Sequence, residues 1–314
     1  MSRLILVTGA DGMLGREVVR QLHERLGDSF GINALGHKAL NISDTEAVRA
    51  AVPSHALVIN CAAWTDVDGA EDPSNRQALY DANCAGPAAL AVACAANTSK
   101  LIHVSTDFVF GGSQQTWPYE ESSLTLPVNA YGASKACGER EVLLTLPDDG
   151  YVLRTSWLYG TKGFVPSILR HGVFGGTSTV TVPYDQMGNP TYVGSLAARI
   201  VTLSMIVVAG RSVPSGVYHA SGMGATTRYE LARTAFAMAG LDPDRVHGIP
   251  SAEIVSPAAR PGYSVLSQQR WQLAGLQPMP TWEAMLQDAV PKIVAKIRTE
   301  NPMSKSLQRP RVGV

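Results

Sequence analysis

The sequence predicts an α/β fold, a doubly wound parallel sheet with a smaller lobe toward the C-terminus. Short β-like runs alternate with helical stretches through the first half of the 314 residues, which is typical of a parallel sheet covered on both faces. A glycine-rich turn stands between the first β-like run and the first helical stretch. After Trp157 the alternation breaks, and proline and glycine become more frequent in segments such as 183–192 and 249–263. This break predicts the second, smaller lobe.

The elements of the sheet are expected in a regular order. A capping-box pattern, Ser43 followed three residues later by Glu46, predicts that the second helix begins at Ser43. The other helices are expected near 13–26, 74–97 and 130–146, and the strands over 3–9, 31–35, 56–63, 100–105 and 150–157.

The second half of the chain is expected to divide between the sheet and the lobe. A helix near 192–209 and a strand over 216–221 are expected to return to the sheet. The polar tail 300–314 is expected to be mobile. The predicted units are a sheet domain of residues 1–157 plus about 192–224, and a lobe of about 158–191 plus 225–299.

Composition excludes several classes of protein. Hydrophobic residues make up 45% of the chain, enough for a sizeable core. Lysine plus arginine equals aspartate plus glutamate at 26 each, so the basic surface of a nucleic-acid-binding protein is not expected. The longest apolar run, 200–210, is too short to span a membrane, and the apolar run near the N-terminus is too brief for a secretory signal. We therefore expect a globular protein that binds neither nucleic acid nor membrane.

The cysteines and histidines show no metal-binding spacing. Cys61, Cys84, Cys94 and Cys137 form no paired motif, and the seven histidines are dispersed. Single cysteines in apolar or helical surroundings are typical of buried thiols in a reducing compartment. We therefore expect four free thiols, no metal site and a cytoplasmic location.

Three glycines, Gly9, Gly12 and Gly15, follow the first strand and open the first helix. Glycine lets the backbone approach a pyrophosphate, and the N-terminus of a helix favours its negative charge. The spacing is GxxGxxG rather than the more common GxGxxG, so the strand before it and the helix after it make the motif informative. This context predicts a Rossmann-type fold and a nicotinamide dinucleotide cofactor.

The end of the second strand bears on the choice of cofactor. NAD enzymes often carry an acid there, which binds the ribose hydroxyls. In this chain the segment 35–41 contains no acid and offers His37 and Lys38 to a 2′-phosphate. We expect NADPH as the cofactor, with NADH as the alternative.

Tyr131 and Lys135 lie four residues apart in the helix expected after the fourth strand, so their side chains share one face. The fourth strand leads into 105–112, and the fourth and fifth strands of such a sheet end beside the nicotinamide half of the cofactor. A tyrosine there can donate a proton, and a lysine one turn away can stabilise the phenolate. An ordinary amphipathic pair is the alternative, and the position after this strand favours catalysis.

A set of segments then follows in order along the chain. They are TGADGMLG at 8–15, INCAAWTDVDGAED at 59–72, DANCAGP at 81–87, HVSTDFVFGG at 103–112, NAYGASK at 129–135, VLRTSWLYG at 152–160, DQMGNPT at 185–191, YHASG at 218–222 and ARPGYSVL at 259–266. Together they resemble the extended short-chain dehydrogenases/reductases and, within them, the dTDP-4-dehydrorhamnose reductases. The resemblance extends from about residue 3 to residue 290.

The resemblance implies an NADP-binding sheet domain and a substrate-binding lobe. The implied reaction is reduction of the 4-keto group of a dTDP-4-keto-6-deoxyhexose, with dTDP-L-rhamnose as the expected product. Tyr131 would give the proton to the carbonyl oxygen, and Lys135 would stabilise the Tyr131 anion and hold the nicotinamide ribose. Thr106, rather than its neighbour Ser105, would hydrogen-bond the substrate oxygen.

The resemblance also implies contact residues. The cofactor contacts are expected at Gly9, Gly12, Met13, Leu14, Gly15, His37, Lys38, Asn41, Ile42, Cys61, Ala62, Ala63, Tyr131 and Lys135. The substrate contacts are expected at Thr65, Val67, Thr106, Phe108, Trp157, Pro190, Thr191 and Arg260, the last of these binding the diphosphate.

Two departures from the family pattern limit these expectations. Asn41 replaces the usual acid in the segment that contacts adenine, which puts that contact in doubt. The acid often found after the Pro-Thr pair is absent at Val193–Gly194, which argues against a metal-assisted dimer contact. A homodimer of another kind stays open.

Three alternatives remain. A sugar-nucleotide 4,6-dehydratase or 4-epimerase shares the fold and the tyrosine–lysine pair, but a dehydratase needs an Asp-Glu pair beside the threonine, where this chain has Asp107-Phe108. A reductase of another dTDP-4-keto-6-deoxysugar would carry the same catalytic set. A non-catalytic NADP-binding subunit, such as the regulatory β subunit of methionine adenosyltransferase, can keep the pair as well.

Overall fold

A six-stranded parallel sheet forms the larger part of the protein, in a computed structural model that describes residues 4–112 and 116–300. The strand order is β10-β5-β4-β3-β1-β2. The chain places β2 on one side of β1 and the later strands on the other side, so the topological switch point lies between β1 and β3. The strands are β1 (Leu4–Thr8), β2 (Gly31–Leu35), β3 (His55–Asn60), β4 (Lys100–Thr106), β5 (Gly150–Thr155) and β10 (Gly216–His219). The predicted parallel α/β fold is confirmed.

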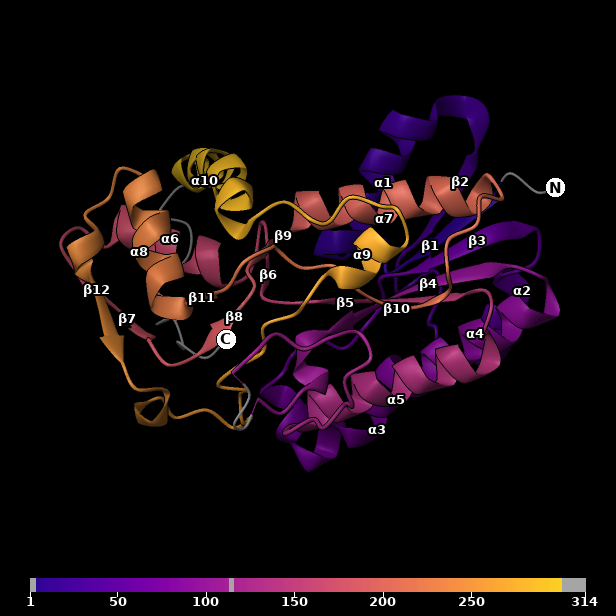
Figure 1. The fold of residues 1–314 in the computed structure, drawn as a ribbon, viewed down its shortest axis with the longest axis horizontal. Coiled ribbons are helices and arrows are strands. Elements are labelled where there is room, and N and C mark those ends of the chain that lie inside the picture. Colours follow the sequence, from indigo (N-terminus) through magenta and orange to yellow (C-terminus); the bar gives the residue numbers. More distant parts are fainter. Residues whose placement is uncertain (1–3, 113–115, 301–314) are drawn as a thin grey trace.

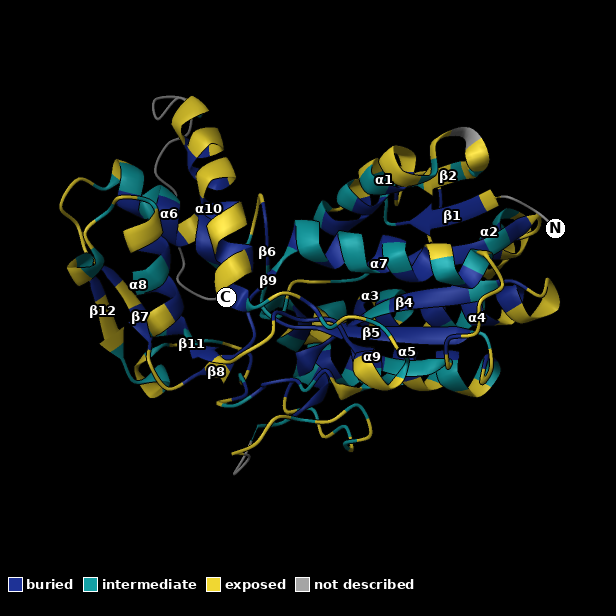
Figure 2. Cartoon of the chain, turned by 45° about the horizontal axis from the view of Figure 1, so that its top comes forward, coloured by how far each residue is buried: buried dark blue, intermediate teal, exposed yellow. Residues whose placement is uncertain are grey.

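Helices cover both faces of this sheet (Figure 1). Helices α1 and α7 pack together on one face, and α2, α4 and α5 pack together on the other. Their bounds are α1 (Met13–Leu26), α2 (Thr45–Ala51), α3 (Arg76–Tyr80), α4 (Gly86–Ala96), α5 (Ala130–Thr145) and α7 (Val193–Val208). Figure 2 shows the central strands buried and the outer helix faces exposed, as expected of an apolar core between two helix layers.

Two expectations about these helices were wrong in detail. The N-cap of α2 is Asp44, whose carboxylate accepts from the backbone N–H of Ala47, while the Ser43 hydroxyl donates to Asn41. The helical stretch expected over 74–97 contains a π-helical turn over Asp81–Ala85. Pro87 has no N–H to donate to the residue four positions earlier, which favours such a turn.

The smaller lobe has its own apolar core. Its helices are α6 (Phe164–Phe174), α8 (Arg228–Met238) and α10 (Trp282–Thr299), and a short helix α9 (Gln269–Leu273) lies beside β10. Its parallel strand pair is β7 (Val180–Pro183) with β12 (Val246–Ile249). The remaining short strands are β6 (Leu158–Tyr159), β8 (Met187–Gly188), β9 (Thr191–Tyr192) and β11 (Thr226–Thr227). Buried side chains such as Leu169, Phe236 and Leu286 form a cluster separate from those of the sheet.

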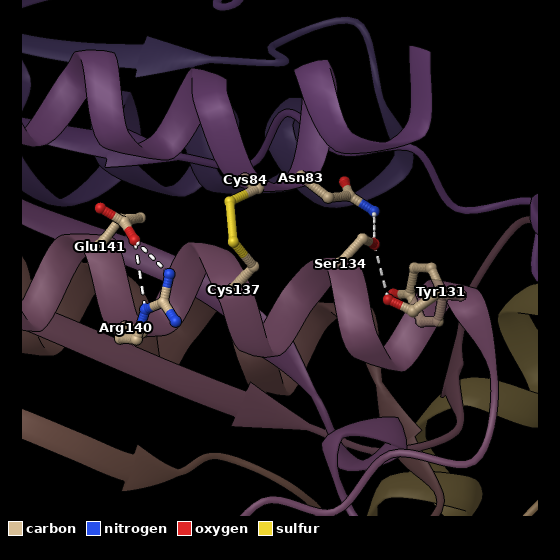
Figure 3. The surroundings of a disulfide bond; sticks show 7 residues. All are labelled: Asn83, Cys84, Tyr131, Ser134, Cys137, Arg140 and Glu141. Carbon is tan, nitrogen blue, oxygen red and sulfur yellow. Dashed lines mark hydrogen bonds and ion pairs between the residues drawn. A yellow bond between two sulfur atoms is a disulfide. The ribbon is translucent and has the colours of Figure 1, made fainter. Parts of the chain in front are cut away.

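The cysteine prediction was wrong for two of the four residues. Cys84 and Cys137 form a disulfide that joins the π-helical turn to α5, and Cys61 and Cys94 are free (Figure 3). The two Cα atoms lie 5.3 Å apart although 53 positions separate the residues, a proximity that only the packing of the two helices creates. The prediction of a reducing compartment was based on four free thiols, and only two of the four cysteines are free.

Among residues 4–112 and 116–300, no helix is both long enough and apolar enough to cross a membrane. No cluster of three or more histidine, cysteine, aspartate or glutamate side chains suited to a metal ion occurs among them. The tail predicted to be mobile, apart from Glu300, lies outside the described residues.

Candidate active site

A cavity of about 610 Å³ lies where the carboxyl ends of β1, β3, β4 and β5 meet the smaller lobe. This is the edge at which doubly wound sheets bind their ligands. The cavity brings together predicted residues from six separate segments of the chain, namely Gly12, Met13, Leu14, Cys61, Ala63, Thr65, Val67, Thr106, Phe108, Tyr131, Lys135, Trp157 and Arg260.

The glycine turn has the shape of a phosphate cradle. Gly9 has φ +65°, and a Cβ on Gly15 would lie 2.2 Å from the carbonyl oxygen of Gly9. Gly12 is the N-cap of α1, and no side chain caps that helix. Its first amides therefore have no side-chain acceptor, at a turn where only glycine allows close approach. The turn fits the pyrophosphate of a dinucleotide, which is the binding role predicted for it.

Other predicted cofactor residues lie beside the cavity rather than on its wall. His37 and Lys38 are exposed in the turn after β2, close to the glycine turn, where Asp11 contacts Gly36. Asn41 is exposed, but Ile42 is buried and contacts Gly86 in the core. The backbone of Ala62 packs against Gly9. Cofactor contacts at these positions stay predictions.

Helix α5 presents Tyr131 and Lys135 to the cavity, one turn apart. The side chain of Asn129 caps the helix by accepting from the N–H of Gly132 over 2.7 Å. The Tyr131 ring meets Phe108 edge to face, with ring centroids 5.9 Å apart. The Lys135 ammonium donates to the carbonyl oxygen of Val104 over 2.7 Å, and its Nζ lies 3.4 Å from Nε2 of His103.

Burial controls the titration of both groups. It raises the pKa of Tyr131 to about 12, which a hydrogen bond with Thr106 partly offsets. It lowers the pKa of Lys135 to about 8, which the negative charge of Glu139 partly offsets. The Lys135 ammonium is directed to Val104, and its expected stabilisation of the phenolate stays a prediction.

Thr106 lies at the end of β4 with its hydroxyl in a defined network. Its Oγ1 donates to Oδ1 of Asp107 over 3.2 Å and accepts from the N–H of Phe108. The neighbouring Ser105 donates to Glu139 instead, which leaves Thr106 as the hydroxyl beside Tyr131.

Sequence reasoning missed two buried residues of this site. Asp107 accepts from the hydroxyls of Ser156 and Ser264, and burial raises the pKa of its carboxyl. The guanidinium of Arg228 lies 3.8 Å from the centroid of the Trp157 ring, and burial lowers its pKa to about 9. The sequence around Arg228 carries no motif that would have pointed to it, although Asp107 lay within a motif.

The predicted substrate residues divide into two groups. Arg260 lines the cavity and forms an ion pair with Asp68. Pro190 and Thr191, by contrast, are buried behind the wall, because Thr191 is part of β9 and its hydroxyl accepts from the N–H of Gly222. Neither residue lines the cavity, and the expected substrate contacts at these positions stay predictions.

A second cavity of about 620 Å³ adjoins the first inside the smaller lobe. Phe164, Arg228 and Arg260 line both cavities. The Nε atoms of both arginines are buried without a hydrogen-bond partner among the described residues. Two cations with unused donors at the junction of two cavities can bind an anionic group that passes between them.

Comparison with known proteins assigns the chain to a family. The family model described as RmlD substrate binding domain matches residues 2–295. The chain belongs to this family. The dTDP-4-dehydrorhamnose reductase of Streptomyces griseus is 45% identical over 296 residues, covering 93% of this chain and 94% of that protein. The dTDP-4-keto-6-deoxy-D-glucose reductase of Streptomyces niveus is 41% identical, with 92% and 97% covered.

A solved structure from this reductase family supports the fold. The dTDP-4-dehydrorhamnose reductase of Bacillus anthracis, in complex with NADP, superposes with a TM-score of 0.82 at 34% identity, covering 93% of this chain and all of that one. The resemblance inferred from the motifs and the Rossmann-type architecture are both confirmed.

Proposed function

We propose that the chain is an NADPH-dependent reductase of the 4-keto group of a dTDP-4-keto-6-deoxyhexose, which forms dTDP-L-rhamnose from dTDP-4-dehydro-L-rhamnose. The observation that carries this proposal is the convergence of Thr106, Tyr131 and Lys135 in one cavity beside the glycine turn. The reductase names of the relatives from two Streptomyces species support the reaction class.

In the proposed reaction the bound nicotinamide supplies hydride, and the protein supplies position and a proton. Tyr131 gives its phenolic proton to the carbonyl oxygen as the alkoxide forms. Thr106 hydrogen-bonds the same oxygen and orients the carbonyl. Phe108 packs edge to face on Tyr131 and restricts the ring.

The two adjoining cavities suit a nucleotide sugar. We place the sugar in the cavity with Tyr131 and the nucleoside in the cavity of the lobe. The diphosphate would then pass Arg228 and Arg260, whose unused donors can bind it. The same catalytic residues would serve any dTDP-4-keto-6-deoxyhexose, so they do not by themselves identify the sugar.

NADPH is the proposed cofactor. The NADP complex of the Bacillus anthracis protein supports it, and His37 and Lys38 are exposed where a 2′-phosphate would lie. Steady-state kinetics with both cofactors test the preference, and equal catalytic efficiency with NADH would refute it. A cytoplasmic location and a homodimer stay predictions from the sequence.

One experiment tests the proposed reaction. The protein is incubated with NADPH and a panel of dTDP-4-keto-6-deoxyhexoses, absorbance is followed at about 340 nm, the band of the reduced nicotinamide, and the product sugar is identified by NMR. The proposal predicts net NADPH oxidation and dTDP-L-rhamnose. Oxidation with a different sugar would indicate the reductase of another deoxysugar pathway. No oxidation with any member of the panel, together with co-purification of a synthetase, would indicate a regulatory subunit.

A further inference from the structure

A row of buried polar side chains crosses three neighbouring strands and ends at Lys135. Thr8 on β1, Asn60 on β3 and His103 on β4 are each 0% exposed. The Thr8 hydroxyl donates to Oδ1 of Asn60 over 2.7 Å, and Nδ2 of Asn60 lies 3.0 Å from Nδ1 of His103. The other ring nitrogen, Nε2, lies 3.4 Å from Nζ of Lys135.

A backbone amide determines the direction of these hydrogen bonds. The N–H of Ala62 lies 3.0 Å from the side-chain oxygen of Asn60, and an N–H can only donate. The oxygen of Asn60 therefore faces Ala62 and Thr8, and its NH₂ group faces His103. Since that NH₂ group donates, Nδ1 of His103 must accept and carries no hydrogen. A neutral His103 then has its hydrogen on Nε2.

This tautomer places an N–H donor opposite the amine of Lys135. An ammonium has three N–H groups and no lone pair, so a charged Lys135 meets His103 donor to donor. A neutral amine has one lone pair, which can accept from Nε2–H of His103 while an amine hydrogen still donates to Val104. The surroundings of Nζ therefore satisfy the neutral amine more fully than the ammonium.

We propose that His103 is a positioning residue for Lys135, because its Nε2–H faces the lysine nitrogen and eases the loss of a proton from the ammonium. This inference rests on the proposed reductase function. When the ammonium loses one proton, the lone pair of the amine accepts from Nε2–H of His103, and an amine hydrogen still donates to Val104. His103 therefore sets the pH at which Lys135 loses its charge, and with it the alkaline limit of turnover.

The other charged groups around Lys135 give the ammonium limited support. Glu139 lies one turn further along α5, but its carboxylate is held by the guanidinium of Arg154 and by the Ser105 hydroxyl. Cys61, after β3, is a thiol whose pKa burial raises to about 12, so it is uncharged near neutrality. Burial lowers the pKa of His103 well below its usual value, so the ring stays neutral over the same range.

Nuclear magnetic resonance tests this proposal without any turnover, so its failure is distinguishable from failure of the reductase function. In protein labelled with ¹⁵N-histidine, the long-range ¹H–¹⁵N spectrum of His103 should show a protonated Nε2 and an unprotonated Nδ1. The ¹³Cε resonance of Lys135 should titrate near pH 8. A protonated Nδ1 in the wild-type protein would overturn the proposal, whether or not any variant folds.

Substitution provides the second measurement. In His103→Gln the amide oxygen can turn to the ammonium, so the pKa of Lys135 should rise by about one unit, and the alkaline limb of kcat should move with it. His219→Gln is the matched control, because His219 is an equally buried histidine on β10 that contacts Ser267 and Arg154 but not Lys135. An unchanged or lowered Lys135 pKa in His103→Gln, or an equal rise in the control, would overturn the proposal.

Discussion

The hydroxyl of Ser264 donates to Oδ2 of Asp107 over 2.6 Å although the two residues lie 157 positions apart. Asp107 follows β4, and Ser264 belongs to the loop that runs from the smaller lobe back to the sheet. The same carboxyl accepts from Ser156 after β5 and from Thr106. One buried acid therefore holds together the end of the catalytic strand, the next strand and the loop of the lobe.

Asp107→Asn should lower kcat about tenfold or more and change KM less. The amide has one accepting oxygen in place of two, so one of the three hydroxyls loses its acceptor and Thr106 is no longer fixed. Ser264→Ala removes a single donor and should have a smaller effect, about fivefold. Steady-state kinetics on both variants check this order. Unchanged kcat in Asp107→Asn would show that the acid has no part in positioning Thr106.

Tyr131→Phe should lose about 99% of turnover or more while cofactor binding is retained. The substitution removes the proton donor and preserves the ring that packs on Phe108. Turnover is followed by NADPH oxidation, and cofactor binding by calorimetry. A rate near that of the wild type would refute the proton-donor role.

Arg228→Met should raise KM for the nucleotide sugar about tenfold or more, with a smaller change in kcat. Methionine retains part of the packing against Trp157 but removes the cation at the junction of the two cavities. Arg233→Met is a suitable control, because Arg233 lies on the same helix and pairs with the exposed Asp244. Equal KM values in the two variants would contradict a substrate role for Arg228.

Stability should fall as the pH is lowered from about 6.5, the usual pKa of histidine, toward 3. Burial lowers the pKa of His219 to about 3 and also lowers that of His103. The unfolded chain binds more protons than the folded protein in this window, so each histidine lowers the free energy of unfolding by up to about 1.4 kcal/mol per pH unit. Urea unfolding at several pH values measures the slope. The slope should be smaller in His219→Gln, and an equal slope would contradict the assignment to His219.

Reduction of the Cys84–Cys137 disulfide should destabilise the fold. The bond closes a loop of 53 positions, for which the entropic contribution is about 4 kcal/mol. Thermal unfolding with and without a reductant measures the loss as a lower Tm. A variant with serine at both positions should have the lower Tm, and its Tm should be the same with and without the reductant. Titration of four thiols in the untreated protein would show that the bond does not form.

The local features of the site were predictable from sequence because short-range geometry determines them. The glycine turn needs only Gly9, Gly12 and Gly15 between a strand and a helix, and the helical period alone places Tyr131 and Lys135 on one face. The parallel sheet followed from the alternation of strands and helices, whereas its strand order came from the structure. The π-helical turn and the Asp44 cap were not predicted. Each depends on which of several adjacent residues accepts the hydrogen bond from a given backbone N–H, and the sequence pattern does not decide this.

Only the tertiary structure decided which distant side chains meet. The disulfide, the contact of Arg228 with Trp157 and the hydrogen bond between Asp107 and Ser264 all join segments that no local pattern relates. The direction of the Lys135 amine on α5 is of the same kind, since it depends on Val104 and His103 on β4. The sequence by itself determined the fold class and the catalytic pair, because both follow from residue spacing. Packing decided burial, hydrogen-bond direction and therefore the titration of that pair, because these depend on neighbours brought together only by folding.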